Sequence, residues 1–268
     1  MGIVQDGDYK AITLERLEDN VLRIWFDHPT NKMNAVDDLL HGEITRLFCE
    51  LKQEDQARAI ILSGKGRAFC AGGDFNWFPE LDSLPAKERL RRDAKQLIWD
   101  FLDIDIPVVA AVNGPAVGLG ASIALLCDTV FMAESAVIAD PHVKVGIVAG
   151  DGGSVIWPLL LGPARAKQYL LTGDSLTASE AERIGLVNKM VADDALDGVS
   201  LAFAQRLAKG APLAVRYTKQ AVNKLVKDAL NISFDTATAL EIVTLQSDDH
   251  HEALAAIKEH REPDFRGE

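Results

Sequence analysis

The sequence of 268 residues lacks the features that mark several classes of protein. It has only 3 cysteines, an odd number without the spacing of a metal site or a disulfide framework. It contains no run of about 18 apolar residues, which argues against a membrane-spanning helix. The formal net charge is −12, whereas a nucleic-acid-binding protein needs a basic face. We therefore expect no metal, membrane or nucleic-acid partner.

The N-terminal residues also lack the pattern of a targeting segment. Residues 1–8 have neither a basic flank nor an apolar core, so a signal peptide is not predicted. Cys49, Cys70 and Cys127 each lie among apolar residues, which is typical of buried free thiols in a reducing compartment. These observations predict a cytoplasmic protein. With 48% apolar residues, the chain can bury a substantial core.

Strands and helices alternate over the first half of the chain, and helices dominate from about residue 152 onward. This order predicts an α/β fold with a helical layer at the C-terminal end. Residues 18–20 give a hairpin signal between the first two strands. The expected strands are 12–17, 21–26, 59–62, 108–112, 129–132 and 136–139. The expected helices are 35–51, 90–102, 121–126, 154–161, 163–171, 178–184, 196–208, 212–229, 232–246 and 251–260.

Two glycine-rich turns are the most informative feature of the sequence. They occupy residues 68–74 and 113–120, and each follows a strongly apolar run. The second opens directly into an apolar helix, whose first backbone N–H groups have no partner within the helix. Glycines in one turn alone indicate little more than a tight bend. Two such turns side by side, however, could direct two N–H groups at one oxygen atom.

The order of Phe-Cys-Ala-Gly-Gly-Asp and Asn-Gly-Pro-Ala-x-Gly-x-Gly resembles the crotonase family, the enoyl-CoA hydratase/isomerase superfamily. Similar motifs lie at residues 31–35, 170–173 and 178–187, and the resemblance runs from about residue 14 to about residue 227. It implies a spiral of β-β-α repeats over residues 1–200 and a helical region over 201–268 that assembles trimers and covers the site. It also implies an acyl-CoA substrate, no separate cofactor, and a homotrimer or dimer of trimers.

By the same resemblance, the N–H groups of Gly73 and Leu119 form an oxyanion hole that stabilises an enolate. The residues expected to border CoA are Lys32, Asn34, Ala35, Ala71, Gly72, Asp74 and Gly118. Only the backbone of Leu119 is needed, so its side chain is no obstacle.

Hydratases of this family use two glutamates, and the matching positions in this chain are Ser122 and His142. Hydration of a C=C bond needs one group that takes a proton from water and another that protonates the α-carbon. Serine does either poorly at neutral pH, whereas histidine can act as base or acid. We therefore expect His142 to be catalytic, Asp151 to orient its ring, and Ser122 to hydrogen-bond water or substrate. Asp151 could otherwise only cap the following helix.

The segment from Pro141 to Pro158 is also similar to the β-diketone hydrolases of the oxocamphor hydrolase kind, which cleave C–C bonds. In that branch a histidine and an aspartate at the positions of His142 and Asp151 form a dyad that activates water. That branch has another histidine at the position of Leu119 and lacks the adjacent glycines, which this chain keeps. Three functions follow: an acyl-CoA hydratase or isomerase first, a C–C hydrolase of a cyclic β-diketone second, and a non-catalytic acyl-CoA-binding protein third.

Two other groups of polar residues have simple interpretations. The basic residues between Lys87 and Lys95 could border the CoA phosphates, but a solvated helix face explains them as well. His250, His251 and His260 lie in a polar region without cysteine ligands, so we expect a solvated helix end rather than a metal site.

Overall fold

The computed structural model describes residues 4, 5 and 7–268. Its main sheet has six strands in the order β1-β2-β3-β4-β6-β9, in which β1 is antiparallel to β2 and every other pair is parallel. These strands are β1 (Ile12–Arg16), β2 (Val21–Phe26), β3 (Ala59–Gly64), β4 (Val108–Val112), β6 (Thr129–Ala133) and β9 (Lys189–Val191). A second sheet joins β5 (Ala116–Val117), β7 (Val137–Ala139) and β8 (Leu176–Thr177).

The helices are α1 (Asp38–Leu51), α2 (Leu84–Asp103), α3 (Leu119–Leu126), α4 (Gly153–Leu161), α5 (Pro163–Thr172), α6 (Ala178–Arg183), α7 (Leu196–Ala208), α8 (Pro212–Thr244) and α9 (Asp248–Glu259). Short 3-10 helices are η1 (Glu18–Asn20), η2 (Phe78–Leu81), η3 (His142–Val145) and η4 (Asp193–Ala195). Among the described residues, no helix has the length and apolar character that crossing a bilayer requires.

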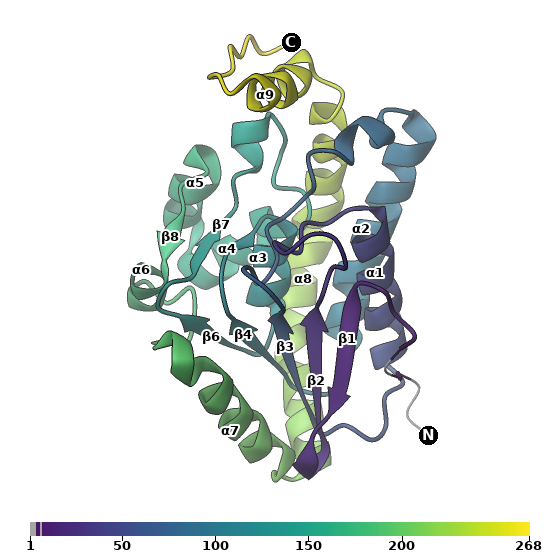
Figure 1. Ribbon diagram of the computed structural model, residues 1–268, viewed down its shortest axis with the longest axis vertical. Coiled ribbons are helices and arrows are strands. Elements are labelled where there is room, and N and C mark those ends of the chain that lie inside the picture. Colours follow the sequence, from purple (N-terminus) through teal and green to yellow (C-terminus); the bar gives the residue numbers. More distant parts are fainter. Residues whose placement is uncertain (1–3, 6) are drawn as a thin grey trace.

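The strand sequences explain which part of the sheet is buried. Every residue of β3 and β4 is buried, as expected for central parallel strands covered on both faces. The α7 helix packs against β3, β4 and β6, whereas α2 packs against α1 and α8. Figure 1 shows α8 running along the long axis of the molecule, with α9 beyond its end. The predicted α/β fold with C-terminal helices is confirmed.

Three expectations from the sequence need correction. The helix expected from residue 35 begins at Asp38, because the side chain of Asp37 accepts a hydrogen bond from the N–H of Leu40 and caps the helix. The helices expected over 212–229 and 232–246 are one helix, α8. No glycine or proline interrupts it, and Leu230 is fully buried where the break was expected. Cys49 is exposed, whereas Cys70 and Cys127 are buried as predicted.

The predicted division after residue 200 falls inside α7. A boundary between two units at this point stays a prediction.

Candidate active site

The two glycine-rich turns lie side by side. The N–H of Val117 donates to the carbonyl of Cys70 at 2.9 Å, and the N–H of Cys70 donates to the carbonyl of Pro115 at 3.1 Å. Gly120 permits this approach, because a Cβ atom there would lie 2.3 Å from the carbonyl oxygen of Cys70. The arrangement anticipated from the sequence is therefore present.

Each turn contributes a residue to the wall of the same cavity. Gly73 and Leu119 both line a cavity of about 570 Å³. The hydrogen bonds between residue 36 and the first turn are made by the carbonyl of Gly72 and the N–H of Asp74, so they leave the N–H of Gly73 unused. Leu119 is the first residue of α3, and its N–H has no partner within the helix. Gly73 and Leu119 thus lie at the same cavity, and their role as an oxyanion hole stays a prediction.

His142 stands beside the second turn. Gly118 has a φ of +53°, and a Cβ atom there would lie 3.4 Å from Cε1 of His142. Any other residue would be strained in its backbone at this φ, and its Cβ would be in contact with the imidazole. The N–H of Gly118 donates to the carbonyl of Ala139 at 3.0 Å, which ties this turn to the end of β7. His142 follows only three residues later, at the start of η3.

Two carboxylates flank the imidazole of His142. Nδ1 is hydrogen-bonded to Oδ1 of Asp140, whose side chain is fully buried. Nε2 lies 3.5 Å from Oδ2 of Asp151. The residue on Nδ1 is therefore Asp140, which the sequence reasoning missed, and the expected partner Asp151 faces Nε2. The sequence feature that could have indicated Asp140 is its position directly after a strand and two residues before His142.

Asp151 is held by its own contacts. It is 6% exposed, and Ser122 Oγ donates a hydrogen bond to its Oδ1 at 3.1 Å. Ser122 is itself fully buried, so the structure gives its hydroxyl a contact with Asp151. The expected contact of Ser122 with water or substrate stays a prediction.

Glu241 is a second acidic residue that sequence reasoning missed. It reaches the cavity from α8 and lines it together with His142 and Asp151. Gly150 leaves room for its side chain, because a Cβ atom at that position would lie 2.5 Å from Oε2 of Glu241. A single acid in a long amphipathic helix carries no readable signal, so only the fold brings this residue to the site.

Burial and neighbouring charges shift the pKa values of His142, Asp151 and Glu241. Burial lowers the pKa of His142, but the charges of Asp140 and Asp151 outweigh burial and raise it to about 10. Burial raises the pKa of Asp151. Burial, together with the charge of Asp151, raises the pKa of Glu241 to about 8. These shifts favour the imidazolium form of His142 and the neutral acid form of Glu241 at neutral pH.

A second cavity of about 370 Å³ adjoins the first, and both are lined by Gly73, Phe78, His142 and Ile147. Three of the residues expected to border CoA, namely Ala71, Gly72 and Gly118, line this second cavity. The remaining four, Lys32, Asn34, Ala35 and Asp74, line neither of the two cavities.

Two of these four have other roles in the fold. The buried Asn34 side chain donates to the carbonyls of Lys65 and Ala68 and so fastens the loop before α1. Asp74 accepts from the N–H of Asn76 at 2.9 Å. CoA contacts of Lys32, Asn34, Ala35 and Asp74 stay predictions.

The basic segment on α2 is largely paired. Lys87, Arg89, Arg91 and Lys95 form ion pairs with Asp82, Asp38, Glu88 and Asp235, respectively. These contacts favour the interpretation as a solvated helix face over a phosphate-binding patch.

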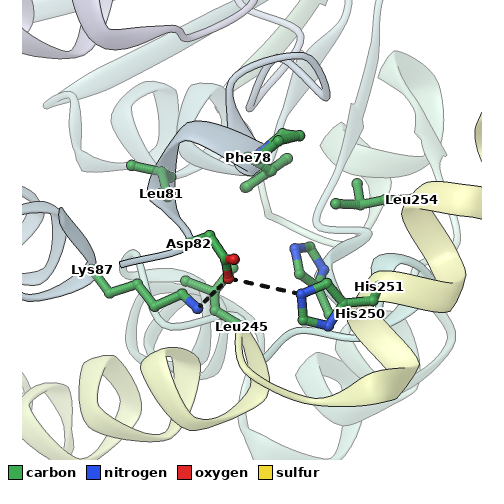
Figure 2. Close-up of a pocket in the computed structure, with 9 residues that line it drawn as sticks. Phe78, Leu81, Asp82, Lys87, Leu245, His250, His251 and Leu254 are labelled. Atoms are coloured by element: carbon green, nitrogen blue, oxygen red, sulfur yellow. Dashed lines mark hydrogen bonds and ion pairs between the residues drawn. The ribbon is translucent and has the colours of Figure 1, made fainter. Parts of the chain in front are cut away.

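His250 corrects the expectation of a solvated helix end. It is 3% exposed, and its Nδ1–H donates to the carbonyl of Val145 at 2.7 Å. Figure 2 shows it beside Phe78 in another pocket, where His251 and Lys87 face Asp82. Because Val145 ends η3, this hydrogen bond ties α9 to the segment that carries His142.

The same cluster has the residue types of a metal site. Asp140, His142 and Asp151 each offer one ligand atom, and these atoms all lie within 4.8 Å of one another. The Nδ1 of His142 is already taken by Asp140, and Oδ1 of Asp151 by Ser122. These hydrogen bonds suit proton transfer better than metal coordination.

Comparison with known proteins shows the family of this chain. The family model for enoyl-CoA hydratase/isomerase matches residues 16–268. The chain belongs to this family. It is 33% identical over 258 residues to an (E)-benzylidenesuccinyl-CoA hydratase of Thauera aromatica, a match that covers 96% of this chain and 99% of the relative. It is therefore an enzyme of the hydratase/isomerase family, and its fold is the crotonase fold.

Solved structures give the same result. An enoyl-CoA hydratase/isomerase from Mycobacterium paratuberculosis is 38% identical, with a TM-score of 0.87 over 92% of this chain and 99% of that one. A β-diketone hydrolase from the cyanobacterium Anabaena is 30% identical, with a TM-score of 0.83 over 89% of this chain and 95% of that one. The resemblances to both branches noted in the sequence are thus confirmed.

Proposed function

We propose that this enzyme adds water to the C=C bond of an enoyl-CoA thioester. The observation that carries the proposal is the position of His142 between two carboxylates, in a cavity that Gly73 and Leu119 also line. The N–H groups of Gly73 and Leu119 would hold the thioester oxygen and stabilise the negative charge that develops on it. The adjoining cavity lined by Ala71, Gly72 and Gly118 would take the neighbouring part of CoA.

The protonation states assign the two proton transfers. Asp151 takes a proton from water, and its raised pKa makes it a stronger base than an ordinary aspartate. The hydroxide oxygen bonds to the β-carbon while the π electrons move toward the thioester oxygen. His142, an imidazolium at neutral pH, donates its Nε2 proton to the α-carbon. A proton then moves from Asp151 Oδ2 to His142 Nε2, which are 3.5 Å apart. This transfer returns Asp151 to the carboxylate and His142 to the imidazolium.

Asp140 and Ser122 position these two groups. Asp140 holds Nδ1 of His142 and keeps the imidazole protonated. Ser122 holds one oxygen of Asp151, so that the other oxygen faces the imidazole. The same pair could move a proton between carbon atoms of an acyl-CoA, which would be an isomerisation.

A second candidate is hydrolysis of a C–C bond in a cyclic β-diketone, favoured by the similarity to the Anabaena β-diketone hydrolase. There, water activated at Asp151 would attack a ketone, and His142 would protonate the departing carbon. The two candidates differ in their need for CoA. A panel of enoyl-CoA thioesters and a panel of cyclic β-diketones, assayed with the same enzyme, separates them: turnover of diketones alone would refute hydration.

We also propose that the enzyme forms a homotrimer or a dimer of trimers. Large apolar side chains are exposed on α5 and α8, among them Leu171, Leu225 and Ile232, which are 71%, 71% and 83% exposed. Apolar surface of this kind is usually covered in an assembly. Light scattering coupled to gel filtration should give three or six chains, and a monomer would contradict the proposal. A cytoplasmic location stays a prediction.

A further inference from the structure

His41 lies in the wall of the catalytic cavity and has no part in the mechanism above. It belongs to α1, is 5% exposed, and lines the cavity together with Gly73, Leu119 and His142. Its Nε2 atom is buried and makes no hydrogen bond with any group in the described part of the chain. A buried polar atom without a partner destabilises the folded state, and an aliphatic side chain at this position would avoid that cost.

The residues around His41 do not provide a hydrogen-bond partner for its Nε2 atom. The neighbouring wall is apolar and consists of Val36, Trp77, Leu90, Ala94 and Ile242. The ring of Trp77 lies 5.7 Å from that of His41, centroid to centroid. None of these side chains hydrogen-bonds Nε2, so a polar group of a bound molecule in the cavity could pair with it.

The charges around His41 indicate whether the group that it binds is charged or uncharged. Burial lowers the pKa of His41, so the ring is neutral at neutral pH. The nearest charged groups that act on it are Asp38, Asp93 and Arg89, and Arg89 is paired with Asp38. Glu241 is uncharged at neutral pH, and among the described residues of the cavity wall Arg91 is hydrogen-bonded to Glu88 at 3.0 Å. The neutral ring of His41 offers a carboxylate no positive charge that would offset its loss of hydration in an apolar wall. An uncharged oxygen on the acyl group therefore suits this place better than a carboxylate.

We propose that His41 determines acyl specificity by hydrogen-bonding an uncharged oxygen, a ketone or a hydroxyl, on the acyl group of the CoA thioester. This inference rests on the proposed function, because it assumes that the thioester oxygen lies at Gly73 and Leu119 and that the acyl group extends from there into the cavity. His41, Trp77 and Leu90 also line a separate cavity of about 420 Å³ between α1 and α2. These three side chains form the partition at which the acyl group ends, so the oxygen belongs near the end of the acyl group that is distant from the thioester.

Binding of unreactive thioesters tests this without relying on turnover. Octanoyl-CoA and its 5-oxo, 6-oxo and 7-oxo derivatives have no C=C bond to hydrate and differ only in one oxygen. Calorimetry should show that at least one oxo derivative binds the wild-type enzyme about tenfold more tightly than octanoyl-CoA, the gain expected for one hydrogen bond to a buried group. His41→Phe should abolish this preference, and His41→Gln, which keeps an N–H group, should retain part of it.

Leu90→Met is the matched control, because it alters the same partition without a polar atom. It should change the affinities for octanoyl-CoA and the oxo derivatives alike. Equal affinity of the wild-type enzyme for all four thioesters would overturn the inference while leaving the proposed function intact. An equal loss of affinity for all four in His41→Phe would also overturn it, because it would mean that His41 only shapes the wall. Failure of octanoyl-CoA to bind the wild-type enzyme would instead contradict the proposed function.

Discussion

Replacing Asp140 by asparagine should separate the charge of this residue from its hydrogen bond. Asparagine has the same shape, and its carbonyl oxygen can still accept the Nδ1–H of His142. The negative charge, however, is lost. In the wild-type enzyme the carboxylates of Asp140 and Asp151 raise the pKa of His142 to about 10, so removal of one carboxylate must lower it.

The size of the change follows from the geometry. Unit charges about 4 Å apart, at an effective dielectric constant of about 20, interact by about 4 kcal/mol. One pKa unit corresponds to about 1.36 kcal/mol, so the pKa of His142 should fall by up to about three units, from about 10 to about 7. Because His142 acts as an acid, activity is lost as the pH rises through this pKa. The variant should therefore be nearly as active as wild type in mild acid and much less active in mild alkali.

The assay is the pH dependence of kcat/KM for an enoyl-CoA thioester, together with an NMR titration of His142. Asp174→Asn is the matched control, because Asp174 is exposed and pairs only loosely with Lys144; it should leave the alkaline limb in place. If Asp140→Asn lowered the rate equally at every pH, or left the alkaline limb near pH 10, the assignment of His142 as a proton donor held by Asp140 would be refuted.

Three further variants test the rest of the site. Asp151→Asn should lower turnover by several orders of magnitude. Its combination with His142→Ala should lower turnover little further, since the effects of residues that act as one unit are not additive. Steady-state rates of folded variants check this, and near-wild-type activity of Asp151→Asn would reject the role of Asp151 as a base. Leu119→Pro removes one donor of the oxyanion hole and should cost about 3 kcal/mol of transition-state stabilisation, and an unchanged rate in a folded variant would exclude Leu119 from the hole. Glu241→Gln should change the rate little at neutral pH, where Glu241 is neutral, but should remove the inflection near its pKa of about 8; a pH profile identical to wild type would show that Glu241 does not act on the site.

The sequence was informative where the function depends on the backbone. Glycines at 118 and 120 are required by a left-handed φ and by a close approach to Cys70, and such requirements leave a pattern in the sequence. His142 was found from the family resemblance, because it occupies the position of a glutamate that hydratases of the family use.

Residues that reach the site from other elements could not be found in this way. Glu241 is about one hundred positions from His142 and resembles any polar residue of a long helix. His41 follows the periodicity of α1, and its position suits a core residue as well as a wall of the cavity. Asp140 was close in sequence, but two aspartates flanked the histidine, and only the structure shows which ring nitrogen each one faces.

The central claim, that this enzyme adds water to an enoyl-CoA through His142, is tested most directly by turnover in oxygen-18 water. Mass spectrometry of the product should show one oxygen-18 atom in a hydroxyl group on the β-carbon with the wild-type enzyme, and almost none with His142→Ala. Label that appears in a new carboxylate after C–C cleavage, or equal labelling of the β-carbon by His142→Ala, would contradict the claim.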